Sequence, residues 1–348
     1  MSETSFIKIN PVSRIPKYKQ IADSIKKGIQ NGQLKMGEKI FSINGLSEQF
    51  DISRDTVEKA YNLLRQQNII VSVKGKGFYV AKTDLSIKHN VLFLINKLST
   101  YKMRIFNAFV EKLGANAKVD LDIYHCEPSV FANILNKKKT QYDYYVIMPH
   151  FRNEHHQHMG CPDDILKMIH RIPPEKLIIV DRNLHSLPAT VGRVYQHFIE
   201  DIYSALKTSL AQIKKYKKVI LAYPNKAIYP YPRDIVKGFK RFCVKYDFDY
   251  EVLDEIYESM ELQIGDLYVV ITENDLVSLV KQTRERHYKL GEEIGIISYN
   301  DTPLKELLGI TVISTDFKKM GRTAAEMILK KEVAAVKNDF NFINRFSA

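Results

Sequence analysis

The chain has 348 residues, 45% of them hydrophobic, which allows a substantial core and two or three domains of ordinary size. Its formal net charge is +12, and the first 83 residues hold 14 Lys and Arg against 7 Asp and Glu, which points to a polyanionic partner. No apolar run is long enough to cross a bilayer and the N-terminus lacks a signal-peptide apolar stretch, so we expect a cytoplasmic protein that does not bind membranes. Three widely spaced cysteines, Cys126, Cys161 and Cys243, indicate reduced thiols.

The first 83 residues predict three helices in helix-turn-helix order. The prolines from Pro11 to Pro16 favour extended backbone, so the first helix is expected from about Lys17. A short second helix follows at about Asn44 to Phe50, and the turn Asp51-Ile52 leads into a third helix.

The third helix, Ser53 to Gln67, has the properties of a helix that reads DNA. Its apolar face is formed at helical spacing by Val57, Ala60, Tyr61 and Leu64. Ser53 is expected to cap the helix, and Arg54 beside it can reach phosphate or a guanine edge. Taken alone, the segment fits an ordinary amphipathic surface helix equally well.

A hairpin with two lysines at its tip is expected next. Ile69 to Val73 predicts a strand, Lys74 to Gly77 a tight turn whose glycines permit positive φ, and Phe78 to Val80 the partner strand. A solvated turn is the plain alternative, but the position directly after three helices favours the wing of a winged helix.

Several segments in this order resemble the GntR winged-helix regulators over about residues 11 to 82: Pro16–Ala22, Gly32–Lys39, Ser53–Val57 and Gly75–Gly77. The resemblance implies DNA contacts from Ser42, Ser53, Arg54, Thr56, Lys59, Gly75, Lys76 and Gly77, and Asn44 can still bond phosphate or a base edge. The chain departs from the family where Ile40-Phe41-Ser42 replaces Leu-Pro-Ser and where Asn44 replaces a DNA-contacting arginine.

We assign residues 1–83 to the winged-helix domain, 84–88 to a linker and 89–348 to an effector domain. In the last of these, near-continuous apolar runs alternate with helical spacing, which predicts buried parallel sheets covered by helices on both faces. The runs lie at residues 91–95, 144–148, 177–180, 219–223, 267–271 and 294–299. About 260 residues favour a two-lobed α/β architecture with a cleft between the lobes.

Later segments resemble the effector domain of lactose-repressor-type regulators: Ile178–Arg182, Arg233–Phe239, Glu273–Leu276, Ile294–Asp301, Ile310–Phe317 and Met320–Ala325. The resemblance implies a fold similar to that of periplasmic sugar-binding proteins, with lobes that are discontinuous in sequence. We expect lobe 1 at about 89–192 and 311–318, and lobe 2 at about 193–309 and 320–348.

Ligands of parallel α/β lobes bind beyond the carboxyl ends of the strands. Groups suited to sugar hydroxyls are expected there: Asn96, His150, Asp181, Arg182, Asn274, Asp275 and Asn300. Arg233 stands at the position of the family's sugar-binding arginine, with an interlobe salt bridge as its alternative. The alternative role of Asp275 is to cap a helix. The alternative role of Asp181 and Arg182 is to orient the hinge and each other.

A metal site and a catalytic site are not expected. Spacing allows two soft ligands from one loop, but no second pair completes a four-ligand site, so we predict an exposed polar loop for His155, His156, His158 and Cys161. No phosphate-binding glycine loop or Ser/His/Asp pattern at an informative spacing is present, and no cofactor is expected.

These features predict a dimeric transcription regulator, with repression as the default, that binds a DNA operator and responds to a small sugar. The combination of domains resembles fucose-responsive repressors, while a pentose or another hexose stays open. One alternative is a sugar-modifying enzyme with an accessory DNA-binding module. Another is a DNA-organising protein whose second domain only oligomerises.

Overall fold

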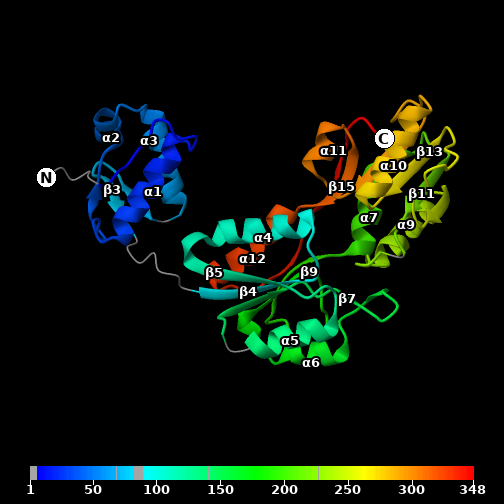
Figure 1. The fold of residues 1–348 in the computed structure, drawn as a ribbon, viewed down its shortest axis with the longest axis horizontal. Helices are drawn as coiled ribbons and strands as arrows, with labels where there is room; N and C mark the ends of the chain where they lie inside the picture. Colours follow the sequence, from blue (N-terminus) through cyan, green and yellow to red (C-terminus); the bar gives the residue numbers. More distant parts are fainter. Residues whose placement is uncertain (1–5, 68, 82–88, 139–140, 226) are drawn as a thin grey trace. The chain divides into compact units, whose positions relative to one another are not determined.

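The computed structural model describes residues 6–67, 69–81, 89–138, 141–225 and 227–348. The chain divides into two compact units, Met1–Lys88 and His89–Ala348, which are described separately (Figure 1). The linker expected at 84–88 lies outside the described residues.

The N-terminal unit is a winged helix-turn-helix. Its elements are α1 (Lys17–Gln30), β1 (Lys39–Ile40), α2 (Ile43–Phe50), α3 (Arg54–Gln66), β2 (Ile70–Val73) and β3 (Gly77–Val80). The face predicted for α3 is buried, and the Tyr61 hydroxyl donates to the Phe41 carbonyl at 2.7 Å, tying the helix to the segment before α2. The wing strands pair in antiparallel register, as expected. β1 was not predicted, because its two residues are too short to show a period; it pairs with β3.

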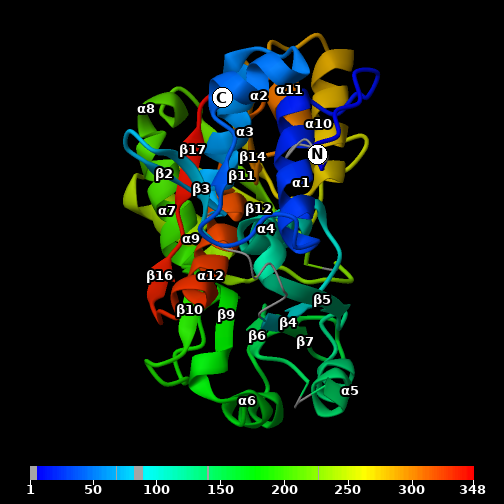
Figure 2. The same ribbon diagram turned by 90° about the vertical axis from the view of Figure 1, so that its left-hand side faces the viewer.

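Lobe 1 of the second unit is built on a parallel six-stranded sheet in the order β16-β10-β9-β6-β4-β5 (Figure 2). Its strands are β4 (His89–Ile95), β5 (Ala117–Ile123), β6 (Tyr144–Ile147), β9 (Leu177–Arg182), β10 (Gly192–Gln196) and β16 (Ala335–Lys337). Its helices are α4 (Thr100–Leu113), α5 (Pro128–Lys138), α6 (Asp163–His170) and α12 (Phe317–Lys330), with short 3-10 turns at Gly114–Asn116 and Pro174–Lys176 and a small hairpin of β7 (Phe151–Arg152) and β8 (His158–Met159).

Lobe 2 has a second six-stranded sheet in the order β12-β11-β13-β14-β15-β17, parallel except for β17. Its strands are β11 (Lys218–Ala222), β12 (Asp249–Leu253), β13 (Asp266–Val270), β14 (Gly295–Tyr299), β15 (Thr311–Thr315) and β17 (Phe340–Ile343). Its helices are α7 (Phe198–Thr208), α8 (Leu210–Ile213), α9 (Asp234–Lys245), α10 (Glu273–Glu285) and α11 (Pro303–Leu307). The predicted fold class, a winged helix followed by two α/β lobes with parallel sheets, is confirmed.

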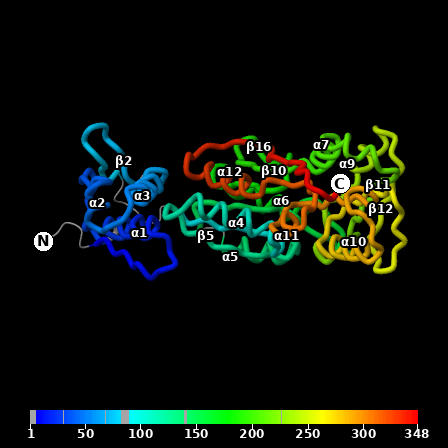
Figure 3. Tube along the Cα trace, turned by 90° about the horizontal axis from the view of Figure 1, so that it is seen from above, coloured from blue at the N-terminus to red at the C-terminus, as the bar shows by residue number. Residues whose placement is uncertain are grey.

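The expected lobe boundaries are wrong in three places. β10 pairs in the sheet of lobe 1, although residues after 192 were assigned to lobe 2. β15 pairs in lobe 2, although 311–318 was assigned to lobe 1. α12 packs along α4 of lobe 1, although 320–348 was assigned to lobe 2 (Figure 3). The chain therefore crosses at His197, at Asp316 and at Asn338–Asp339.

Close packing of α12 on α4 explains the glycine in its first turns. A Cβ on Gly321 would lie 2.2 Å from the carbonyl oxygen of Ile105, so only glycine lets the two backbones approach this closely. The crossings themselves are tied together: Asn338 donates from Nδ2 to the Asp316 carbonyl at 2.9 Å, and its backbone N–H donates to the Tyr195 carbonyl at 2.8 Å.

Candidate DNA-binding surface and interlobe site

The start of α3 presents polar groups to solvent. The Ser53 hydroxyl accepts from the Thr56 N–H at 3.3 Å and lies 2.8 Å from the Thr56 hydroxyl, so Ser53 is the predicted N-cap. Arg54 and Lys59 are exposed, and neither has a hydrogen bond or ion pair within the described part of the chain. Both cations are therefore free to meet an anion.

Ser42 and Asn44 lie at the start of α2. The Ser42 hydroxyl accepts from the Gly45 N–H at 3.0 Å and thus caps this helix, while Asn44 is exposed. In the wing, Gly75 and Gly77 have φ of +73° and +108°, the left-handed region that favours glycine, and Lys76 between them is exposed. All of these residues are accessible to a ligand. The Ser42 hydroxyl, however, already uses one of its lone pairs to cap α2.

Asp181 is the centre of a buried polar cluster at the carboxyl end of β9. Its Oδ2 accepts from the Lys102 ammonium and from His150 Nε2, the latter at 2.8 Å, and its Oδ1 accepts from Gln196 Nε2. Only 2% of Asp181 and 8% of Lys102 are exposed, so the ion pair is shielded from water. We call Lys102, His150, His158, Asp181 and Gln196 the Asp181 cluster.

One placement of the ring protons satisfies the histidines of this cluster. His150 Nε2–H donates to Asp181, His158 Nε2–H donates to His150 Nδ1 at 3.2 Å, and Arg182 donates to His158 Nδ1 at 3.4 Å. Both rings are then neutral. Burial is the main cause that lowers the pKa of His150 to about 4, and the charge of Lys102 is the second. Burial also lowers the pKa of His158, to about 2.

Asp181 itself stays ionised. Burial alone would raise its pKa, but the charge of Lys102 and the hydrogen bond from His150 hold the pKa of Asp181 well below its usual range. The cluster also reaches two lobe crossings, because Gln196 ends β10 and accepts a hydrogen bond from Thr315, which ends β15. It therefore joins the interlobe face of lobe 1 to the hinge.

Four non-glycine residues near the facing ends of the two sheets have left-handed backbone: His125, Cys126, Asp181 and Asn300, with φ of 52°, 60°, 77° and 65°. Such conformations cost about 1–3 kcal/mol each and tend to cluster at binding sites. Two amides there have oxygens without a partner among the described residues, Asn96 Oδ1 and Asn300 Oδ1. Asn96 is 4% exposed, and its Nδ2 donates to Cys126 Sγ at 3.3 Å.

Contacts between the lobes surround these residues. His125 Nδ1 lies 2.9 Å from the Tyr229 hydroxyl, and Arg152 donates to the Ile228 carbonyl at 2.5 Å. Arg104 donates to the Asp301 carbonyl at 2.7 Å. Lys97 lies over the Tyr231 and Tyr229 rings, 4.6 and 5.7 Å from their centroids.

The other predicted effector residues are placed differently. Arg233 and Asn274 are exposed, at the N-terminal ends of α9 and α10. Asp275 is buried, accepts from the Ile256 N–H at 2.8 Å and from the Thr272 hydroxyl at 2.5 Å, and gives its own N–H to Thr272. Its carboxylate holds the start of α10, which fits helix capping better than ligand binding.

Sequence reasoning missed several residues of this site. His158 was assigned to an exposed loop, whereas β8 brings it against His150 and Arg182; the prediction is wrong for His158, while His155 and His156 are exposed as expected. Lys97 directly follows Asn96, and Tyr229 and Tyr231 follow β11, so the end-of-strand criterion could have found all three. Lys102 lies inside a helix and gave no such signal.

Among the described residues, no group of three or more His, Cys, Asp or Glu side chains could hold a metal ion. The same residues contain no helix that is both long and apolar enough to cross a membrane.

Residues 17–80 match the family model "Bacterial regulatory proteins, gntR family". Over 131 residues the chain is 33% identical to the uncharacterized HTH-type transcriptional regulator YydK of Bacillus subtilis (strain 168), covering 37% of this chain and 51% of that protein. The chain thus spans about half the length of this relative.

The second unit is similar to solved regulator structures. A LacI family transcriptional regulator from Lactobacillus casei with bound glucose matches with a TM-score of 0.57 at 14% identity, covering 74% of this chain and 99% of that one. The trehalose repressor from Escherichia coli matches with a TM-score of 0.57 at 13% identity, covering 74% and 100%. The Bacillus subtilis and Lactobacillus casei proteins are named as transcriptional regulators, and the Escherichia coli protein is named as a repressor. Residues 17–80 of this chain therefore match the gntR family of bacterial regulatory proteins, and the second domain has a two-lobed fold similar to that of LacI-type regulators.

Proposed function

We propose that the protein is a transcription regulator, by default a repressor, that binds an operator through α3 and the wing and releases it when a small sugar binds between the lobes. One observation carries the proposal: the chain contains both a winged helix that matches the gntR family, with unpaired cations on α3, and a two-lobed domain. Such a protein would act on DNA in the cytoplasm. A ligand shifts the lobe equilibrium only by its differential affinity for the two arrangements.

A sugar fits the interlobe groups. Asn96 and Asn300 offer unpaired amide oxygens to hydroxyls, Arg182 offers a guanidinium, and the Tyr229 and Tyr231 rings can cover an apolar sugar face. Glucose is bound in the Lactobacillus casei structure. L-Fucose belongs in the test panel with common hexoses and pentoses.

Fluorescence anisotropy with DNA from upstream of the protein's own gene tests both halves of the proposal. We expect specific binding that weakens when the effector is added, and unchanged sugar after incubation. Sugar turnover would favour the enzyme alternative, and specific DNA binding that no sugar alters would favour a DNA-organising role.

Arg54→Ala is expected to weaken specific operator binding by roughly 10- to 100-fold, because one good base contact contributes about 1–3 kcal/mol. Lys76→Ala is the contrast: a wing-tip lysine that meets phosphate should lower affinity for operator and random DNA alike. Gel shifts on both DNAs measure the difference. Unchanged operator affinity of Arg54→Ala would remove this residue from the proposed interface.

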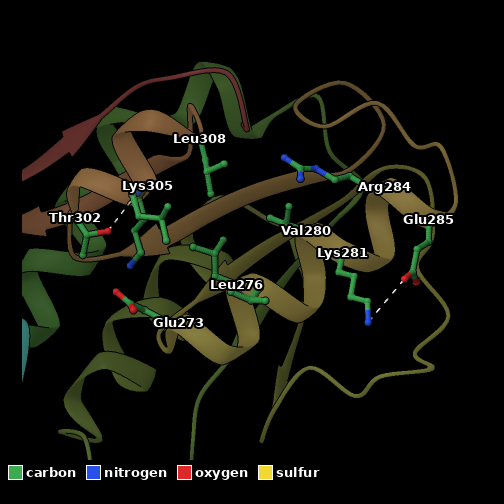
Figure 4. A pocket seen from close by; sticks show the side chains of 11 residues that line it. Glu273, Leu276, Val280, Lys281, Arg284, Glu285, Thr302, Lys305 and Leu308 are labelled. Atoms are coloured by element: carbon green, nitrogen blue, oxygen red, sulfur yellow. Dashed lines mark hydrogen bonds and ion pairs between the residues drawn. The ribbon is translucent and has the colours of Figure 1, made fainter.

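We propose further that the protein is a homodimer through α10 and α11. A groove of about 400 Å³ lies between these helices, and Figure 4 shows Leu276, Val280 and Leu308 lining it. Leu304 and Leu307, on α11, are 56% and 82% exposed. An apolar patch of this kind suits a self-complementary contact, and a second copy also supplies the second recognition helix of a two-fold operator.

Leu307→Asp is expected to raise the dimer dissociation constant at least about tenfold, because the contact would bury an unpaired carboxylate. Val244→Asp on α9, where an apolar side chain is 69% exposed outside the groove, is the matched control. Sedimentation equilibrium measures both variants. Equal dissociation constants for Leu307→Asp and wild type would exclude this face.

A further inference from the structure

We propose that the effector is anionic, a small sugar or sugar derivative that carries a phosphate or carboxylate group, and that Lys97 binds this group. The inference rests on the proposed function, because it names the chemical class of ligand for the same interlobe site. It starts from the charges around that site.

Lys97 is a half-buried cation without a counter-ion. Its ammonium has no hydrogen-bond acceptor and no carboxylate within ion-pair distance in the described residues, and its contacts are the Tyr229 and Tyr231 rings of lobe 2. Burial first, and the like charge of Lys102 second, lower the pKa of Lys97 to about 8. A desolvated ammonium beside another cation is unfavourable, and a bound anion would reverse this.

The carboxylates of lobe 1 near Lys97 are already paired, and Glu273 of lobe 2 hydrogen-bonds Tyr101. Asp181 neutralises Lys102 and accepts from His150 and Gln196, and Glu127 pairs with Arg152. Both histidines of the Asp181 cluster are neutral at physiological pH because burial lowers their pKa values. The lobe 1 face therefore keeps an uncompensated positive charge at Lys97.

Arg182 strengthens this positive side. Its hydrogen-bond partner among the described residues is His158, whose Nδ1 accepts at 3.4 Å, and it has no ion pair there. Asp234 acts on it only at longer range. Its remaining N–H groups can meet an oxyanion or a hydroxyl.

Asn96 supplies the second half of the recognition. It directly precedes Lys97, is 4% exposed, and its Oδ1 has no partner among the described residues. A buried acceptor that lacks a donor is unfavourable, and a ligand hydroxyl would supply the missing hydrogen bond. The Lys97 ammonium can therefore bind the anionic group of a ligand while the Asn96 amide binds a hydroxyl. A phosphorylated or acidic sugar would use both groups, whereas a neutral sugar would use only the amide.

Thermal shift and calorimetry with matched probes test the inference: D-glucose, D-glucose 6-phosphate, D-glucuronate, L-fucose, L-fucose 1-phosphate and inorganic phosphate, at equal ionic strength. We expect at least one anionic probe to bind about tenfold more tightly than its neutral parent, or inorganic phosphate to raise the melting temperature. Tighter binding of the sugar phosphates would identify the anionic group as a phosphate, and tighter binding of glucuronate would identify it as a carboxylate. Either result supports the proposal.

Lys97→Gln should reduce the preference for anionic over neutral probes about tenfold, Lys97→Arg should keep most of it, and Lys240→Gln, an exposed lysine on α9, should not change it. Loss of affinity for neutral and anionic probes alike would show only a structural role and overturn the proposal. Equal binding of neutral and anionic probes to wild type, or no response to any anion, would also overturn it. If a neutral sugar still releases the operator, the proposed function stands while this inference fails.

Discussion

Asp181→Asn is expected to lower the unfolding free energy of the His89–Ala348 unit by about 3–5 kcal/mol, because it leaves the Lys102 ammonium buried and unpaired. The single amide oxygen can accept from only one of His150 and Gln196, so the loss includes one of these two hydrogen bonds as well as the charge. Urea unfolding followed by circular dichroism measures it.

Two further variants separate the charge from general disruption. Glu200→Gln removes one partner of an exposed ion pair with Arg241 and should change stability by less than about 1 kcal/mol. Adding Lys102→Met to Asp181→Asn removes the unpaired charge and should recover part of the lost stability. A loss below about 1 kcal/mol for Asp181→Asn alone would contradict the cluster as described.

Acid is expected to destabilise the same unit well above the range in which carboxylates titrate. The folded-state pKa of His150 lies at about 4 against an ordinary value of 6.5, so the unfolded chain takes up the proton first as the pH falls through this window. His150 alone should therefore remove roughly 3 kcal/mol of stability between about pH 6.5 and pH 4. His158 shifts in the same direction and adds to the effect.

Asp181 does not explain this slope. Its folded-state pKa is depressed, so its contribution is present above the unfolded value of 3.8 and is lost only at lower pH. Urea unfolding at several pH values, for wild type, His150→Gln and the exposed control His185→Gln, measures the dependence. His150→Gln should flatten the curve and His185→Gln should leave it unchanged; a curve for His150→Gln as steep as wild type would refute the assignment.

Elements with strong local signals were predictable from the sequence. The α3 face, its Ser53 cap and the two-glycine turn of the wing depend on residues close in the chain, so period and turn chemistry suffice. The central strands of both sheets were visible as apolar runs because both their faces are buried. The edge strand β5 alternates apolar and polar residues and was missed.

The sequence by itself determined the two kinds of domain, the buried strands and the end-of-strand residues Asn96, His150 and Asp181. Only the tertiary structure decided the three crossings, because a strand or helix near a crossing is equally apolar in either lobe. It alone also brought Lys102 to Asp181, across 79 positions of sequence, and His158 to His150, which contacts Asp181. The partners of a buried carboxylate depend on which groups lie close to it in space and on how far pairing offsets the free-energy cost of its desolvation. Neither quantity can be read from the spacing of residues along the chain.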